Sequence, residues 1–342
     1  MTDKLPQKIL IIGPAWVGDM VMAQTLFKLI KQRNPNVIID VLAPAWSAPL
    51  LARMPEVSQF IVLPFNHGEF KFIERFKFGR QLKSTKYDQA IILPNSFKSA
   101  FIPFFAGIPL RTSWRGEMRW GLLNDIRYLN KEKLPLMIER FMALGLNKNE
   151  QIPKPYPRPS LIFSEQDRKL AIAKHQLTIS QKPIMALCPG AEFGPAKRWP
   201  AEYYAEIANK KLAEGWNVWI FGSPKDQTEA AIIQKITNNN CIDLTGKTSL
   251  AEAIDLLSLA NLVVSNDSGL MHIAAALNRP LIVLYGSSDP RFTPPLSDNV
   301  KILSLKLSCS PCFQRKCPLQ HQKCLRDMSS SMVFNAMAEL NI

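Results

Sequence analysis

The chain of 342 residues lacks any apolar run of about 18 residues, the length that a membrane-spanning helix requires. A secretory signal is also missing, because residues 1–6 are polar and lead directly into a strand-like segment. We therefore expect a cytoplasmic protein whose six cysteines remain mostly reduced. These absences argue against an integral membrane protein and against a disulfide-stapled secreted domain.

Several common signatures for phosphate and nucleic acid are missing as well. The first glycine loop is followed by Asp19 and Met20, where an ATP-type P-loop has Lys and Ser or Thr, and G-x-G-x-x-G is absent. No Asp-x-Asp occurs, which disfavours a diphosphate chelated by a metal ion. Without zinc-finger spacing, an RNP motif or a clear helix-turn-helix, nucleic acid is not an expected partner.

Acidic residues are the scarcer charged group, and the formal net charge is +14. Residues 1–150 contain 21 basic and 12 acidic residues, whereas residues 151–342 contain 21 and 16. A positive field of this kind favours a polyanion such as nucleic acid, an anionic membrane surface or a phosphorylated substrate.

Short apolar runs that alternate with helical or polar segments predict an α/β protein with parallel sheets covered on both faces. The expected strands are residues 8–13, 37–43, 59–63, 88–93, 183–188, 216–221, 261–265 and 281–285. Prolines at 153, 155, 157 and 159 predict an extended linker over residues 151–160. We therefore expect two doubly wound domains, residues 1–152 and 161–342, with a last helix at 332–340 that could return to the first.

Two turns place acidic residues where a strand meets a helix. Asp19 follows the first strand, and it is either a helix N-cap or a functional carboxylate in the crevice. Asp267 follows the strand 261–265, where it could hold a sugar hydroxyl, cap the next helix, or both. His272 lies one turn into that helix and could reach the same crevice, although an N-cap beside a core histidine is the simpler alternative. Lys197 and Arg198 could neutralise a diphosphate there.

Residues 68–86 interleave phenylalanines with lysines and arginines. One interpretation is an amphipathic helix on the sheet with its lysines in solvent, and the other is a basic, aromatic surface that meets an anionic amphiphile. On the second interpretation the acceptor-binding candidates are five arginines: Arg75, Arg80, Arg111, Arg115 and Arg119.

Four cysteines near the end follow the pattern Cys309-x2-Cys312-x4-Cys317-x6-Cys324, with His321 among them. The spacing differs from the paired C-x2-C of a robust zinc site. Reduced structural thiols and a metal site both remain open at this point.

The Gly-Asp at residues 18–19, Pro-Gly-Ala…Ala-Lys-Arg-Trp-Pro at 189–200 and Ser-Asn-Asp-Ser-Gly-Leu-Met-His at 265–272 together resemble the bacterial lipopolysaccharide heptosyltransferases. The cysteine-rich stretch at 309–318 is similar to the heptosyltransferase II branch. The resemblance implies a GT-B fold, with two Rossmann-like domains facing across a cleft. It also implies inverting transfer of heptose from ADP-heptose to the first heptose of the lipopolysaccharide inner core, a phosphorylated glycolipid, by a peripheral enzyme at the anionic inner-membrane face.

Carried over to this sequence, the resemblance makes Asp19 the general base and Lys197 the contact to the diphosphate. It places Asp267 on the heptose hydroxyls, Thr248 near the adenosine and Asp226 on the ribose, and it implies no cofactor and no metal. The remaining donor-binding residues are those of the helix start: Ser268, Gly269 and His272.

Other functions remain open on the sequence alone. They are a heptosyltransferase I-type enzyme, a UDP-sugar transferase or epimerase of the same fold, and a non-catalytic binder of anionic lipid or nucleic acid. Donor competition separates the enzymes from one another, and a turnover assay separates them from a binder.

Overall fold

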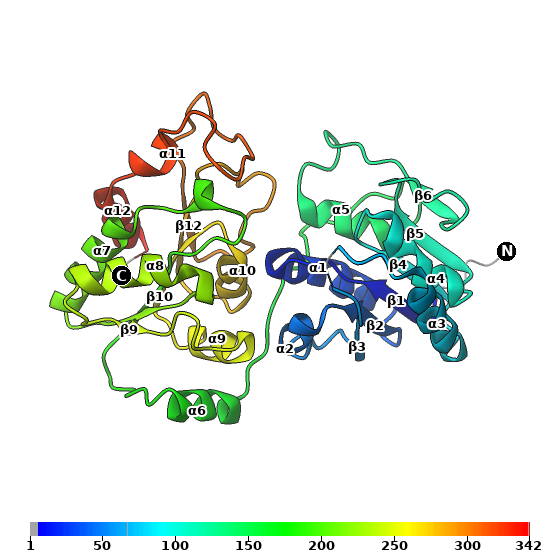
Figure 1. The fold of residues 1–342 in the computed structure, drawn as a ribbon, viewed down its shortest axis with the longest axis horizontal. Helices are drawn as coiled ribbons and strands as arrows, with labels where there is room; N and C mark the ends of the chain where they lie inside the picture. Colours follow the sequence, from blue (N-terminus) through cyan, green and yellow to red (C-terminus); the bar gives the residue numbers. More distant parts are fainter. Residues whose placement is uncertain (1–5, 67, 341) are drawn as a thin grey trace. The chain divides into compact units, whose positions relative to one another are not determined.

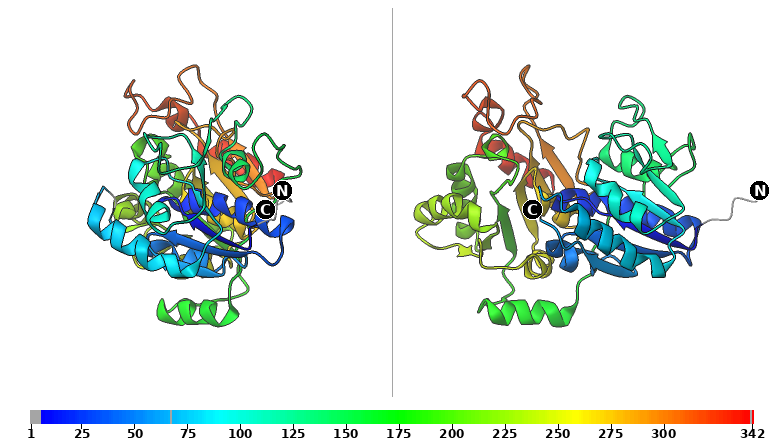
Figure 2. Two further views of the ribbon diagram at one scale, coloured as in Figure 1. Left: turned by 90° about the vertical axis from the view of Figure 1, so that its right-hand side faces the viewer. Right: turned by 45° about the vertical axis from the view of Figure 1, so that its right-hand side comes forward.

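The computed structural model describes residues 6–66, 68–340 and 342, and the chain divides into two compact units, Met1–Pro159 and Ser160–Ile342. Within the described residues each unit is built on a six-stranded parallel sheet with helices packed against it (Figures 1 and 2). None of the helices in this part of the chain is long and apolar enough to cross a membrane.

The first sheet has the order β3-β2-β1-β4-β5-β6. Its strands are β1 (Lys8–Ile12), β2 (Ile38–Ala43), β3 (Gln59–Val62), β4 (Gln89–Ile92), β5 (Leu110–Trp114) and β6 (Asp125–Arg127). The helices are α1 (Val17–Arg33), α2 (Ala48–Leu51), α3 (Phe72–Leu82), α4 (Phe101–Phe105) and α5 (Met137–Leu144), with 3-10 turns at Ala45–Ser47, Lys83–Thr85 and Phe97–Ala100. Because β1 pairs with both β2 and β4, the chain direction across the sheet reverses between β1 and β4, which is where open α/β sheets bind ligands.

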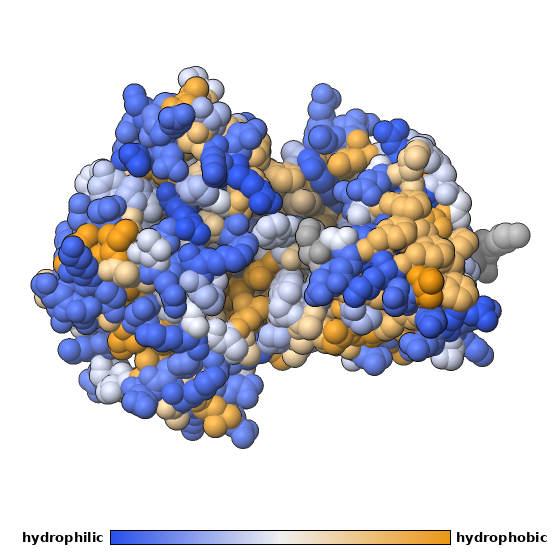
Figure 3. All heavy atoms as spheres, viewed as in Figure 1, coloured by the Kyte–Doolittle hydropathy of each residue, from blue (hydrophilic) through white to orange (hydrophobic). Residues whose placement is uncertain are grey.

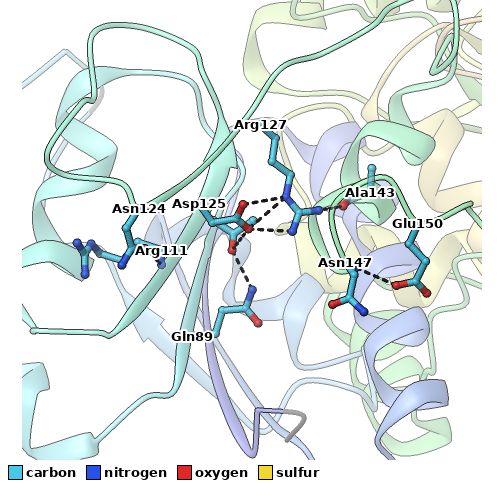
Figure 4. Close-up of polar contacts among 9 residues, drawn as sticks. Gln89, Arg111, Asn124, Asp125, Arg127, Ala143, Asn147 and Glu150 are labelled. Atoms are coloured by element: carbon cyan, nitrogen blue, oxygen red, sulfur yellow. Dashed lines mark hydrogen bonds and ion pairs between the residues drawn. The ribbon is translucent and has the colours of Figure 1, made fainter. Parts of the chain in front are cut away.

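A buried polar chain ties the outer strands of this sheet together (Figure 4). Gln89 Nε2 donates to Thr112 Oγ1 at 2.9 Å, and that hydroxyl donates to Asp125 Oδ2 at 2.9 Å. Arg127 then donates to Asp125 at 2.8 Å and to the carbonyl of Ala143 in α5. These strands can carry polar side chains because each one has a hydrogen-bond partner on its own strand, on the neighbouring strand or in α5.

The second sheet has the order β12-β11-β10-β7-β8-β9. Read from β9 to β12, this is the same arrangement as the order β3 to β6 of the first sheet. Its strands are β7 (Ile184–Cys188), β8 (Asn217–Ile220), β9 (Ile242–Asp243), β10 (Leu262–Asn266), β11 (Leu281–Leu284) and β12 (Val300–Leu303). The helices are α6 (Glu165–Lys174), α7 (Ala201–Ala213), α8 (Gln227–Ile236), α9 (Leu250–Leu257), α10 (Gly269–Ala276), α11 (Lys323–Arg326) and α12 (Ser330–Glu339), with 3-10 turns at Pro195–Lys197 (η4) and Pro224–Asp226 (η5). The strands β7 and β10 are adjacent and form the corresponding switch point.

The last helix, α12, packs against α7, β11 and β12 of its own unit. Val333, Ala336 and Met337 bury its apolar side in the core that α7 also covers. Strands β5, β6, β9 and β12 were not predicted, and all of them are short or interrupted by polar residues.

Candidate functional site

The switch point of the second unit brings together two loops that are about 70 residues apart in sequence. Residues after Cys188 and residues after Asn266 leave the same edge of the sheet, since Ser265 pairs with Cys188 in parallel register. Lys197, at the end of η4, and Asp267, directly after β10, meet there. The Lys197 Nζ lies 2.5 Å from Asp267 Oδ2.

This ion pair is largely withdrawn from water. Asp267 is 5% exposed, and the Lys197 side chain is 17% exposed. Lys197 has three N–H donors, so one hydrogen bond to Asp267 leaves donors for a further anion. The pair therefore places a cation and an acceptor of hydroxyl hydrogens side by side.

Asn266 connects the loops that carry Lys197 and Asp267, and the sequence analysis gave it no role. It is fully buried, its Oδ1 accepts from Trp199 N and the Tyr204 hydroxyl, and its Nδ2 donates to the Pro189 carbonyl at 2.6 Å. The signal in the sequence was an amide at the end of an apolar strand. A buried amide side chain is stable in a protein core when its oxygen and nitrogen both have hydrogen-bond partners, as they do here.

Ser268 is the N-cap residue of α10, but its side chain makes no capping hydrogen bond. Its hydroxyl lies 3.3 Å from the Ser265 hydroxyl instead. The first-turn N–H groups, beginning at Gly269, are therefore not capped by Ser268, and a helix start of this kind attracts anions.

His272 lies in the first turn of α10 and is buried. Burial lowers its pKa to about 4, with nearby Asp267 raising the pKa and Lys197 lowering it. The imidazole is consequently neutral at pH 7, and it can donate one hydrogen bond and accept another.

Asp226 has a structural role that its sequence position does not reveal. Its Oδ2 accepts from Ser223 N and Oγ at 2.8 Å each, and its Oδ1 pairs with Arg198 at 3.2 Å. The carboxylate also lies so close to Gly190 that an added Cβ there would stand 2.3 Å from Asp226 Cγ. Both oxygens already accept hydrogen bonds within the protein, and the ribose contact of Asp226 stays a prediction.

Arg198 is likewise engaged, because it also pairs with Glu229 at 2.5 Å. The diphosphate contact considered for it stays a prediction. Thr248 lies in the loop between β9 and α9, partly buried, one residue before the Ser249 N-cap. Its placement near adenosine stays a prediction.

Asp19 is the third residue of α1, and Trp16 is the N-cap residue. The simple N-cap hypothesis is therefore wrong, because the helix begins at Val17 rather than at Met20. Gly13, after β1, lets α1 pack close to the end of that strand, since a Cβ at Gly13 would lie 2.7 Å from the Met20 methyl. Asp19 is partly exposed in the first turn, where the helix dipole favours a negative charge.

Two of the five predicted acceptor arginines have a different role. Arg75 is 3% exposed and donates to the carbonyls of Phe70 and Glu69, and burial lowers its pKa. Arg119 is 1% exposed and donates to the Pro94 and Trp114 carbonyls, and burial lowers its pKa to about 10. Both guanidiniums hold loop backbone in place, so the prediction of a surface contact is corrected.

The other three remain accessible to different degrees. Arg80 and Arg115 are exposed. Arg111 is partly buried and donates to the carbonyls of Leu122 and Ile108, and its backbone N–H is held by Asn124 (Figure 4). The acceptor contacts expected for Arg80 and Arg115 stay predictions.

The cysteine-rich loop packs directly against the loop that carries Lys197. Ala196 N donates to the Arg315 carbonyl at 3.1 Å, and Gly194 has no room for a Cβ because that carbonyl would lie 2.5 Å away. The Phe193 ring is close to two cations, with Lys197 Nζ at 5.0 Å and Arg315 Cζ at 5.5 Å from its centroid. Arg315 is a site candidate that the sequence alone did not single out.

The four thiols of this loop are all free and partly exposed. Cys324 is buried enough that its pKa is raised, with the other three cysteines of the loop nearby adding to the effect. Among residues 6–66, 68–340 and 342, no three His, Cys, Asp or Glu side chains are grouped so that they could hold a metal ion.

Each unit has a Rossmann-like parallel sheet, and the second brings a charged pair and an anion-attracting helix start together at its switch point. A family model for glycosyltransferase family 9 (heptosyltransferase) matches residues 75–323. Lipopolysaccharide heptosyltransferase 2 of Escherichia coli K12 is 50% identical over 307 residues, which cover 87% of this chain and 88% of that protein.

Lipooligosaccharide heptosyltransferase 2 of Haemophilus influenzae is 48% identical over 308 residues, with the same coverage of 87% and 88%. The solved structure of E. coli ADP-heptose LPS heptosyltransferase II superposes with a TM-score of 0.87 at 45% identity, covering 97% of this chain and 98% of that one. The chain belongs to glycosyltransferase family 9, the heptosyltransferases, and the predicted α/β GT-B fold is confirmed.

Proposed function

We propose that the protein transfers L-glycero-D-manno-heptose from ADP-heptose to the first heptose of the lipopolysaccharide inner core, with inversion. The relatives named above are lipopolysaccharide or lipooligosaccharide heptosyltransferases by name, and the name of the solved E. coli structure includes ADP-heptose. The observation that carries the proposal is the Lys197–Asp267 pair beside the start of α10, because it offers a cation for a diphosphate next to a carboxylate for sugar hydroxyls.

The loops that follow β10, β7, β8 and β9 leave the sheet in that spatial order. Adjacent strands are about 4.8 Å apart, so the loops span about 14 Å, an extent that suits a nucleotide sugar. Heptose would lie at Asp267, the diphosphate at Lys197 and the first turn of α10, and adenosine toward Thr248. His272, neutral and buried beside the pair, would hold the orientation of the sugar or phosphate oxygens.

The proposed reaction is a single displacement. The acceptor hydroxyl oxygen attacks the anomeric carbon, its proton passes to Asp19, and the bond between that carbon and the ADP oxygen breaks. Lys197 and the α10 N–H groups stabilise the negative charge that develops on the leaving ADP. No step requires a metal ion.

The test measures ADP release from ADP-heptose by the purified protein, with and without heptosyl-Kdo2-lipid A, in the presence and absence of EDTA. We expect ADP release that depends on the acceptor and survives EDTA, and no release of UDP from UDP-sugars. Equal release without acceptor, complete loss in EDTA that Mg²⁺ restores, or preference for a UDP-sugar would each contradict the proposed function.

Arg315 is proposed as a second cation for the diphosphate. Lys197 is already paired with Asp267, whereas Arg315 is exposed and no described carboxylate lies within ion-pair distance of it. We expect Arg315→Ala to weaken ADP binding about tenfold, in line with the loss of one charge-assisted hydrogen bond, and Arg315→Lys to retain part of it. The neighbouring exposed Lys316→Ala is the matched control, measured by calorimetry with ADP. Equal affinities for Arg315→Ala and Lys316→Ala would remove Arg315 from the site.

The acceptor would be bound through the first unit, with Arg80 and Arg115 as its proposed cationic contacts. Such an acceptor is a phosphorylated glycolipid, so the protein would work as a peripheral enzyme on the anionic cytoplasmic face of the inner membrane. The net positive charge of residues 1–150 supports this arrangement.

A further inference from the structure

The first unit exposes a group of large apolar side chains over α3, α4 and the turns beside them (Figure 3). We call this group the phenylalanine surface, and its six members are each 37–64% exposed: Phe70, Phe72, Ile73, Phe76, Phe97 and Phe104. Contiguous exposed apolar side chains of this kind mark an interaction site.

The phenylalanine surface is held rigidly by rings beneath it. Phe101, which is buried, and the half-buried Phe105 form the base. Phe72 meets Phe101 edge-on at 5.2 Å between centroids, and Phe76 meets Phe105 at 5.0 Å. Because the rings are already packed, they lose little conformational freedom when a partner buries them.

The helix α3 is turned so that two of its three aromatic residues, Phe72 and Phe76, are exposed. Of its eleven residues only Arg75 and Gly79 are buried, and Gly79 brings α3 close to α4, since an added Cβ would lie 2.7 Å from Phe105 Cβ. Lys77 lies in solvent while Phe78 and Leu82 pack on the core, so α3 has the amphipathic character of the first interpretation, and it exposes Phe72 and Phe76 as well. Phe78 is the aromatic residue of α3 that packs on the core.

The surroundings of the phenylalanine surface are positively charged. Residues 69–86 contain six basic and two acidic residues, and Glu69 is already paired with Lys71 at 3.1 Å. Lys77, Arg80 and Lys83 are exposed. An apolar centre with a basic rim complements an anionic bilayer, whereas a second copy of the same surface would be repelled by its like charge.

We propose that the phenylalanine surface inserts into the interface of an anionic bilayer, with α3 lying in the membrane plane and its basic residues contacting lipid phosphates. The inference deepens the proposed function by naming the surface through which the enzyme reaches a membrane-embedded acceptor. It does not depend on which sugar is transferred.

The test is co-sedimentation with vesicles of phosphatidylglycerol and phosphatidylethanolamine, compared with vesicles of phosphatidylcholine alone. We expect the wild type to prefer the anionic vesicles, and Phe72→Ser/Phe76→Ser to lower binding to them about tenfold or more at low and at high salt. Lys77→Glu/Lys83→Glu should lower binding mainly at low salt, because added salt screens the charge attraction. Leu170→Ser is the matched control, since Leu170 is an exposed apolar residue on α6 of the second unit.

ADP affinity and thermal melting check that each variant folds. The inference would be overturned if Phe72→Ser/Phe76→Ser bound anionic vesicles as well as the wild type does. It would also be overturned if this variant changed from dimer to monomer in sedimentation velocity while its vesicle binding stayed the same. Transfer assays separate it from the proposed function. The phenylalanine variant should lose turnover on vesicle-embedded acceptor while keeping it on a deacylated one, whereas vesicle binding without heptose transfer by the wild type would refute only the function.

Discussion

Asp19→Asn is expected to fold and to bind ADP-heptose as the wild type does, yet to lose about two to four orders of magnitude in kcat, the usual scale for removal of a general base. The amide is nearly the same size as the carboxylate but cannot accept the acceptor's proton. Asp19 lies in the first turn of α1, where the positive end of the helix dipole attracts negative charge. Single-turnover kinetics with saturating ADP-heptose measure the effect directly.

The chain provides a matched control for this substitution. Asp167 is the third residue of α6, as Asp19 is the third residue of α1, and it is exposed. Both Asp→Asn changes should cost about 0.3–1 kcal/mol of stability through the loss of a charge at a helix start. Only Asp19→Asn should change kcat. Similar kcat values for the two variants would show that Asp19 serves α1 and not the reaction.

The central strands of both sheets were predictable because they are buried on both faces and their sequences are continuous apolar runs. Ile9, Leu10 and Ile11 of β1 and Val263 and Val264 of β10 show this pattern. The outer strands could not be predicted in the same way. In β5 and β6, Thr112 and Asp125 are stable in a sheet only because Gln89 and Arg127 satisfy them, and such pairing is visible only in three dimensions.

The candidate site likewise has parts that the sequence predicts and parts that only the structure reveals. The turn after β10 was predictable, because a polar Asn-Asp-Ser-Gly follows an apolar strand and precedes a helix. The pairing of Lys197 with Asp267 follows from the adjacency of β7 and β10, which a single sequence does not reveal. Arg119 was misjudged for a related reason, since one of its partners, the Pro94 carbonyl, is 25 residues away in sequence.

Lys197→Ala is expected to slow transfer by about two to three orders of magnitude and to weaken ADP-heptose binding, because it removes the cation proposed to stabilise the departing diphosphate. It should also destabilise the second unit by about 3 kcal/mol, because Asp267 is then a buried carboxylate without its partner. Lys197→Arg should recover part of both losses, since the charge persists with altered geometry.

A double variant separates the two effects. Lys197→Ala/Asp267→Asn removes the stranded charge, so its thermal stability should return close to that of the wild type, as followed by calorimetry. Its turnover should stay as low as that of Lys197→Ala or fall further, because the diphosphate still lacks its cation and the heptose loses a carboxylate contact. If the double variant regained turnover along with stability, Lys197 would act only by holding Asp267 in place, and the stabilisation of the leaving group would have to come from the α10 N–H groups and Arg315.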